Sequence, residues 1–178
     1  MENVFLKETG HRFFKWENLG NIKEGRAGLG EEMPVLVYRL MEFTMYDILA
    51  KKFGEEKANQ CFRDAGFLAG KEFTRNVLDL SVPFDKFIAN LQKTLLDLKI
   101  GIMRIEEVNE ETGEILLTVG EDLDCSGLPI TGETVCTYDE GFISGILETY
   151  TGKPYAVHEI DCWASGDRVC RFRCNQSY

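Results

Sequence analysis

The spacing of apolar residues changes at Gly101 in this chain of 178 residues, and the change restricts the folds that the chain can adopt. Up to that point apolar residues recur every three or four positions, the period of helices that bury one face. The three helices predicted there cover 34–53, 55–78 and 83–98. Beyond Gly101, shorter runs predict a hairpin, one helix from 137 to 152, and a second hairpin. The predicted strands cover 101–108, 114–119, 155–160 and 168–174. Because strands in this order pair locally, we expect an α+β fold with an antiparallel sheet.

Two short patterns refine the helices. Thr137 and Glu140 stand at capping-box spacing, which predicts that the fourth helix begins there. The second helix carries a stripe of small residues, namely Ala65, Gly66, Ala69 and Gly70. A glycine inside a helix costs about 1 kcal/mol relative to alanine, so the stripe indicates close approach of another backbone. We expect helix-on-helix packing there rather than the floor of a ligand site.

The chain reads as an N-terminal arm over 1–33 followed by a single domain over 34–178. The arm is aromatic at Phe13, Phe14 and Trp16 and then rich in glycine, so we expect it to pack on the domain or on a dimer partner. Its glycines from Gly25 to Gly30 follow the spacing G-x-x-G-x-G without a preceding apolar strand, which argues against a dinucleotide-binding loop.

The charge balance excludes several classes of partner. Thirty acidic side chains face 20 basic ones, a formal net charge of −10, whereas nucleic acids and anionic membranes are bound by clustered Lys and Arg. Apolar runs are too short to span a bilayer, and charged residues interrupt any signal sequence over 1–15. We therefore expect a cytoplasmic protein, in which clustered cysteines bind metal or carry out redox chemistry.

Four residues near the C-terminus have the spacing of a metal site, C-x22-E-x2-C-x7-C: Cys136, Glu159, Cys162 and Cys170. The last hairpin brings Glu159, Cys162 and Cys170 together, and the helix N-terminus at Cys136 favours the thiolate form that metals bind. Three thiolates and a carboxylate suit tetrahedral Zn²⁺ better than Mg²⁺ or Ca²⁺. Four protein ligands leave no open position, so the predicted zinc is structural.

Other interpretations of these cysteines stay open. Cys162 and Cys170 can form a disulfide across the hairpin, and Cys174, on the strand face of Cys170, can replace one ligand. Cys61 is expected to be a small buried hydrophobe within a helix, and Cys125 has no assigned role. His158 alternates to the strand face opposite Glu159 and is not expected to bind metal.

The C-terminal third resembles the V4R (4-vinyl reductase) domain. The resemblance rests on Cys136-Thr-Tyr-Asp-Glu-Gly-Phe-Ile-Ser-Gly-Ile-Leu147, Tyr150-Thr-Gly-Lys-Pro154 and Glu159-Ile-Asp-Cys-Trp-Ala-Ser-Gly-Asp-Arg-Val-Cys-Arg-Phe172. It implies the ligand-binding fold known from nitric-oxide signalling and Golgi transport, in which helices and an antiparallel sheet enclose an apolar pocket. It also implies zinc at Cys136, Glu159, Cys162 and Cys170. Family members include sensory domains of aromatic-responsive activators, proteins of bacteriochlorophyll biosynthesis and predicted hydrocarbon binders.

The resemblance therefore predicts a zinc-stabilised module that binds a small apolar or aromatic molecule and acts through a partner or a homodimer. The histidine and tryptophan that anchor phenol in the sensory branch have no counterparts here, since His11, His158, Trp16 and Trp163 lie elsewhere. The alternative function is a reductase or an accessory protein of tetrapyrrole metabolism, although the sequence has no nicotinamide or flavin loop. A third possibility is an assembly subunit that dimerises through the arm and the first predicted helix.

Overall fold

The computed structural model describes residues 13–177, and the chain divides into two units between Glu32 and Met33. Within 13–32 the chain forms a 3-10 helix, Trp16–Leu19, and one helical turn, α1 (Ile22–Gly25), neither of which has a buried residue. Residues 1–12 of the predicted arm lie outside the described residues.

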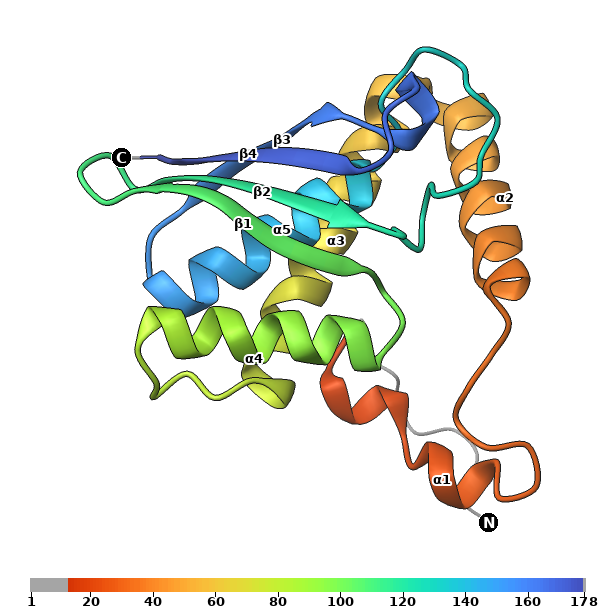
Figure 1. Ribbon diagram of the computed structural model, residues 1–178. Coiled ribbons are helices and arrows are strands. Elements are labelled where there is room, and N and C mark those ends of the chain that lie inside the picture. The colour runs from red at the N-terminus through yellow and green to blue at the C-terminus, as the bar shows by residue number, and fades with distance from the viewer. Residues whose placement is uncertain (1–12, 178) are drawn as a thin grey trace. The chain divides into compact units, whose positions relative to one another are not determined.

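The second unit has the predicted α+β architecture (Figure 1). Its helices are α2 (Val35–Phe53), α3 (Glu55–Val77), α4 (Phe84–Asp97) and α5 (Thr137–Thr151). Its strands are β1 (Ile102–Asn109), β2 (Glu114–Gly120), β3 (Tyr155–Asp161) and β4 (Cys170–Gln176), with a short 3-10 helix, Trp163–Ser165, between the last two. The helices and strands predicted from apolar spacing are thus confirmed to within a few residues.

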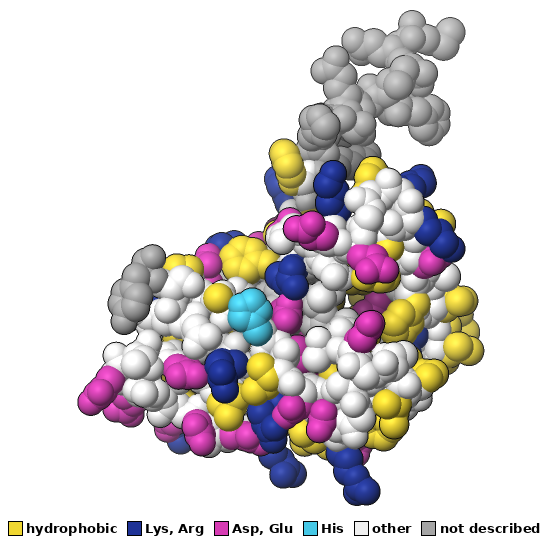
Figure 2. All heavy atoms as spheres, turned by 90° about the horizontal axis from the view of Figure 1, so that it is seen from above, with side chains coloured by type: hydrophobic (Ala, Val, Ile, Leu, Met, Phe, Trp, Pro, Cys, Tyr) yellow, Lys and Arg dark blue, Asp and Glu magenta, His cyan; other side chains and the backbone are white. Residues whose placement is uncertain are grey.

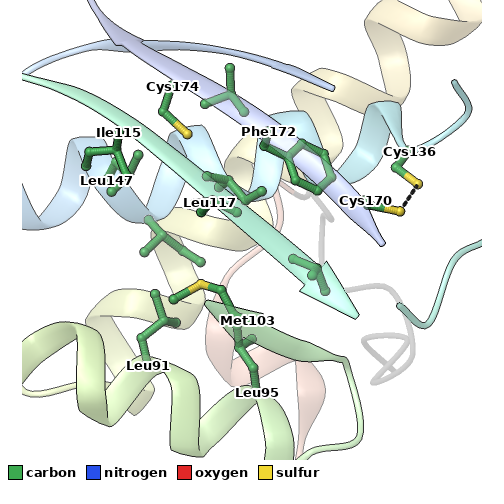
Figure 3. Packing of buried hydrophobic residues seen from close by; sticks show 14 of the residues in the cluster. Leu91, Leu95, Met103, Ile115, Leu117, Cys136, Leu147, Cys170, Phe172 and Cys174 are labelled. Atoms are coloured by element: carbon green, nitrogen blue, oxygen red, sulfur yellow. Dashed lines mark hydrogen bonds between the residues drawn. The ribbon is translucent and has the colours of Figure 1, made fainter. Parts of the chain in front are cut away.

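The four strands form one antiparallel sheet in the order β1-β2-β4-β3. The two hairpins are local, but the central pairing of β2 with β4 joins distant parts of the chain and places Val119 opposite Cys170. Helices α4 and α5 cover one face of the sheet, and α3 packs behind α5 (Figure 1). The apolar core lies between this face and the helices (Figure 3).

Glycines on both partners hold α3 against α5. A Cβ built on Gly66 or Gly70 would overlap the carbonyl oxygens of Tyr138 or Phe142 in α5. In α5, Gly141 and Gly145 likewise approach the carbonyls of Arg63 and Phe67 in α3. The small-residue stripe is therefore a helix-packing surface, as predicted, and its counterpart in α5 completes it.

The predicted capping box is wrong, although the helix begins at Thr137 as expected. Cys136 is the N-cap, and no side chain caps the first turn. Glu140 instead faces the sheet and α3, where it accepts hydrogen bonds from the Glu159 backbone N–H (2.9 Å) and from Arg63 Nε (2.8 Å). The Glu140 carboxylate thus accepts hydrogen bonds from two other elements, although the local sequence pattern predicts that it caps its own helix.

Helix α2 turns mostly polar residues, together with Leu49 and Ala50, toward the domain and exposes most of its large apolar residues. The half-buried Tyr38, Arg39, Glu42 and Tyr46 are polar, and no residue of the helix is buried. Six large apolar residues of the helix are 50–75% exposed; we call them the α2 apolar surface: Leu36, Leu40, Met41, Met45, Ile48 and Phe53. Figure 2 shows hydrophobic side chains along the edge of the molecule where α2 lies. Within 13–177, no helix has the length and hydropathy needed to cross a membrane.

Candidate metal centre and adjoining cavity

Four buried cysteines converge at one end of the sheet: Cys125, Cys136, Cys162 and Cys170. Their Sγ atoms all lie within 4.8 Å of one another. Cys136 Sγ is 3.8 Å from both Cys162 Sγ and Cys170 Sγ, and Cys125 Sγ is 3.0 Å from Cys170 Sγ. Figure 3 shows Cys136 and Cys170 facing each other where β4 meets the start of α5. We refer to the four residues as the thiol cluster.

Each member of the thiol cluster comes from a different segment. Cys170 begins β4, and Cys162 follows β3 across the same hairpin. Cys136 is the N-cap of α5. Cys125 lies in the segment after β2, which leaves the sheet beside Cys170 because β2 pairs with β4. Hydrogen bonding among the thiols, with Cys125 as the foremost partner, lowers the pKa of Cys162 and raises the pKa values of Cys136 and Cys170.

Glu159 borders the cluster through the backbone of Cys136. Its Oε2 accepts a hydrogen bond from the Cys136 N–H at 2.9 Å. Its Oε1 is buried and has no hydrogen-bond partner within the described part of the chain. Burial raises the pKa of this carboxyl to about 8. One oxygen thus holds the start of α5, and the other is free to bind a further group.

The structure brings the predicted metal ligands close together and adds one more cysteine. Cys136, Cys162 and Cys170 are brought together, and Glu159 lies beside them. Cys125 joins the cluster, and the sequence reasoning missed it because its position depends on the pairing of β2 with β4. All six cysteines are free, so the disulfide alternative is not formed. Cys174 lies farther along β4 beside Ile115, away from the thiol cluster (Figure 3).

Two further sequence expectations concern residues near the site. Cys61 is exposed rather than buried, which corrects the expectation of a buried hydrophobe; it lies on the outward side of α3. His158 is exposed on the sheet face opposite Glu159, as the strand alternation predicts.

The segment that carries Cys125 is fixed on several sides. Asp122 Oδ1 accepts hydrogen bonds from the backbone N–H groups of Asp124 (2.9 Å) and Cys125 (3.2 Å). Arg39 of α2 donates hydrogen bonds to three carbonyls of this segment. Its Nε donates to Leu123 at 2.7 Å, and its Nη2 donates to Ser126 at 2.9 Å and to Asp122 at 3.4 Å. Arg39 thereby closes the turn that presents the cysteine. We call residues 122–126 the cysteine turn.

Carboxyl groups surround the same turn. Tyr38 Oη donates to Asp124 Oδ1 at 2.9 Å, while Asp124 Oδ2 is buried without a partner among the described residues. Burial, reinforced by the neighbouring carboxylates, raises the pKa of Asp124 to about 7 and that of Glu42 to about 8. Burial also raises the pKa of Asp122 and Asp139. The low-dielectric surroundings therefore oppose additional negative charge next to the thiols.

An apolar cavity of about 30 Å³ adjoins the site. Side chains of α4, β1, β2 and α5 line it, with Asp122 and Asp139 as its acidic residues. A volume of this size holds one or two water molecules, whereas small-molecule pockets usually measure about 300–1,000 Å³. A ligand therefore has to displace side chains of this lining in order to enter.

The chain is similar to several archaeal proteins of unknown function. The V4R domain model matches residues 115–176. Uncharacterized protein MJ1642 of Methanocaldococcus jannaschii is 30% identical over 144 residues, covering 81% of this chain and 78% of that protein. Uncharacterized protein MJ0150 of the same organism is 30% identical over 103 residues, covering 58% of each. The chain thus spans little more than half the length of this second relative.

Solved structures share the fold at low sequence identity. A vinyl-4-reductase family protein of M. jannaschii superposes with a TM-score of 0.62 at 15% identity, covering 95% of this chain and all of that one. The phenol-responsive sensory domain of the transcription activator PoxR, with phenol, gives 0.60 at 15% identity, covering 83% and 76%. A trafficking protein particle complex subunit 3 from Naegleria fowleri, covalently bound to palmitic acid, gives 0.57 at 12%, covering 80% and 96%. The matched segment, the relatives and the shared architecture agree: this chain belongs to the V4R domain family.

Proposed function

We propose that the protein is a cytoplasmic, zinc-stabilised module that binds a small apolar or aromatic molecule. The observation that carries the proposal is the apolar cavity enclosed between α4, α5 and the sheet, directly beside the thiol cluster. The PoxR sensory domain, which shares the fold, was solved with phenol, a small aromatic molecule. The metal then fixes one end of the fold, and the cavity is the site where a ligand enters.

Zinc fits the donor set of the proposed site. Cys136, Cys162 and Cys170 supply three thiolates, and Zn²⁺ prefers sulfur and nitrogen donors in tetrahedral sites. The family motif assigns the fourth position to Glu159, whose Oε1 is available. Zinc bound in this way would hold the N-terminus of α5 to the last hairpin and serve a structural role.

The small cavity shapes the expected binding behaviour. Opening it separates apolar side chains of α4 and α5 that otherwise contact one another, and this cost lowers the apparent affinity. Burial of the ligand's apolar surface offsets the cost by about 25 cal/mol per Å². The protein should therefore select ligands by shape and hydrophobicity, with polar groups directed to the end occupied by Asp122 and Asp139.

Native mass spectrometry combined with elemental analysis of the purified protein tests this proposal. We expect one zinc per chain and the retention or uptake of a small lipophilic compound. As a control, substitution of Leu91 by Trp should fill the cavity and abolish uptake while zinc remains bound, because Leu91 lines the cavity and is absent from the thiol cluster. A wild-type protein that takes up nothing from a chemically diverse set of apolar compounds would refute ligand binding.

A second observation favours homodimerisation as the route of output. The six residues of the α2 apolar surface are each at least half exposed, and together they form an extended apolar surface on one helix. An apolar surface of this size marks an interaction site. We take a second copy of the chain as its partner, because two α2 apolar surfaces would cover each other, and the exposed Asp47 and Lys51 on the same helix already pair at 2.5 Å.

A further inference from the structure

We propose that Cys125, rather than Glu159, is the fourth metal ligand, and that metal binding through Cys125 controls how firmly α2 is seated on the domain. This inference rests on the proposed function, because it concerns the same metal site. It changes the ligand set from three thiolates and a carboxylate to four thiolates. It also means that metal binding regulates how the α2 apolar surface is held on the domain.

The geometry of the thiol cluster supports four sulfur ligands. A zinc–sulfur bond of about 2.3 Å places the corners of a tetrahedral site about 3.8 Å apart. Two edges of the cluster, from Cys136 Sγ to Cys162 Sγ and to Cys170 Sγ, measure 3.8 Å. The edge between Cys125 and Cys170 measures 3.0 Å and has to open by about 0.8 Å to match. All remaining sulfur separations lie within 4.8 Å.

Cys125 is held in this position by its own burial and by a hydrogen bond to its backbone. Its side chain is fully buried and its Sγ faces Cys170. The carboxylate of Asp122 fixes its backbone N–H. A buried thiol next to three others is a better donor for a thiophilic metal than a carboxylate oxygen. The turn around Cys125 thus places one sulfur atom in the thiol cluster.

Glu159 already has a structural task. Its Oε2 accepts the N–H of Cys136, so the carboxylate is anchored on the backbone of one ligand rather than directed only at the cluster. Hydrogen bonds of this kind orient metal ligands from outside the coordination sphere. Glu159 is then a positioning residue for Cys136.

The cysteine turn connects the site to α2. Arg39 donates hydrogen bonds to three carbonyls of the turn, and Tyr38 donates to Asp124 in the same turn. These polar contacts lie on the half-buried side of α2, which faces the domain, whereas the α2 apolar surface faces solvent. A metal bound to Cys125 orders the turn, and an ordered turn holds Arg39 and therefore α2. Loss of the metal loosens the helix that carries the proposed dimer surface.

Cobalt-substituted full-length protein tests the ligand assignment. Tetrahedral Co²⁺ bound by thiolates absorbs in the near ultraviolet through sulfur-to-metal charge transfer, with an intensity that rises with the number of thiolates. We expect Cys125→Ser to lower this absorption by about a quarter, in proportion to one thiolate of four, and Glu159→Gln to leave it unchanged. Cys174→Ser is the matched control, because Cys174 is a buried thiol outside the cluster.

The outcomes separate the inference from the proposed function. A spectrum changed by Glu159→Gln and not by Cys125→Ser overturns the inference while leaving a metal site in place. Failure of the wild-type protein to bind zinc or Co²⁺ overturns the proposed metal function itself. If Cys125→Ser does not fold, the wild-type charge-transfer intensity and the Glu159→Gln spectrum still distinguish four thiolates from three.

Hydrogen exchange tests the link to α2. We expect metal removal to speed amide exchange in the cysteine turn and throughout α2, and we expect Cys125→Ser with metal bound to reproduce the effect in α2 while sparing β3 and β4. Exchange in α2 that does not respond to the metal overturns the link.

Discussion

At the scale of single residues, two ion pairs between the same two helices differ in what they hold. Arg63 pairs with Glu140 at 2.8 Å and Lys71 pairs with Glu148 at 3.0 Å, eight residues farther along both α3 and α5. Only Glu140 also accepts a backbone N–H, that of Glu159, whose side chain holds Cys136. The Glu140 pair therefore supports the thiol cluster, whereas Glu148, at 29% side-chain exposure against 10% for Glu140, joins only the two helices.

This difference predicts unequal costs. Glu140→Ala leaves the Glu159 N–H and a partly buried guanidinium without their acceptor, and should lower the free energy of unfolding by about 2 kcal/mol. Glu148→Ala, the matched control, should cost no more than about 1 kcal/mol. Denaturant unfolding of the metal-loaded protein measures both. Equal costs for the two substitutions would mean that Glu140 contributes only its ion pair.

The capping motif and Cys125 show why residue roles are harder to predict than elements. Thr137 and Glu140 have capping-box spacing, but that spacing contains no information about Arg63 or the Glu159 N–H, which take the carboxylate. Cys125 reaches the cluster through a strand pairing between distant segments. The three other cysteines were predictable because one hairpin and one helix start, both local patterns, place them.

At the scale of elements, apolar periodicity predicted α2 and left its surroundings undetermined. The pattern gives the helix period, and a stripe of apolar residues is equally suited to a core or to a partner. The structure decides between them, because Tyr38, Arg39 and Glu42 face the domain and the α2 apolar surface faces solvent. The glycine stripe was easier to interpret, since close backbone approach explains glycines one turn apart, Gly66 and Gly70, on α3.

The α2 apolar surface predicts a dimer that single charges disrupt. Ile48→Asp and Leu40→Asp place a carboxylate in the proposed interface, where burial without a partner is strongly unfavourable. Both should shift the protein from dimer to monomer in light scattering at micromolar concentration. Leu96→Asp in α4 is the control, because Leu96 is similarly exposed, at 54%, but lies outside the α2 apolar surface. A wild-type protein that is monomeric under these conditions would contradict the prediction.

At the scale of the whole molecule, the thiol cluster brings together segments from three parts of the chain at one end of the sheet. Its four cysteines belong to the cysteine turn, the start of α5 and the two arms of the last hairpin. The core around α4 and β1, with Leu91, Leu95 and Met103, contains none of these cysteines and is held by apolar packing (Figure 3). From the proposed metal site, we expect the half of the fold that holds the cluster to depend on the metal more than the half around α4 and β1 does.

Removal of the metal should separate these halves. Structural zinc contributes apparent free energies of about 10–16 kcal/mol in zinc fingers, comparable with the roughly 5–15 kcal/mol that stabilises a whole domain. A chelator, or Cys162→Ala, should therefore lower the melting temperature sharply and expose amides of β3, β4 and the first turns of α5 to exchange. Amides of α4 should lose protection last, because its contacts with β1 involve no cysteine of the cluster.

Cys61→Ser, a change of an exposed thiol, is the control and should leave the melting temperature unchanged. A melting temperature that a chelator does not alter would show that the thiol cluster stabilises the fold without metal.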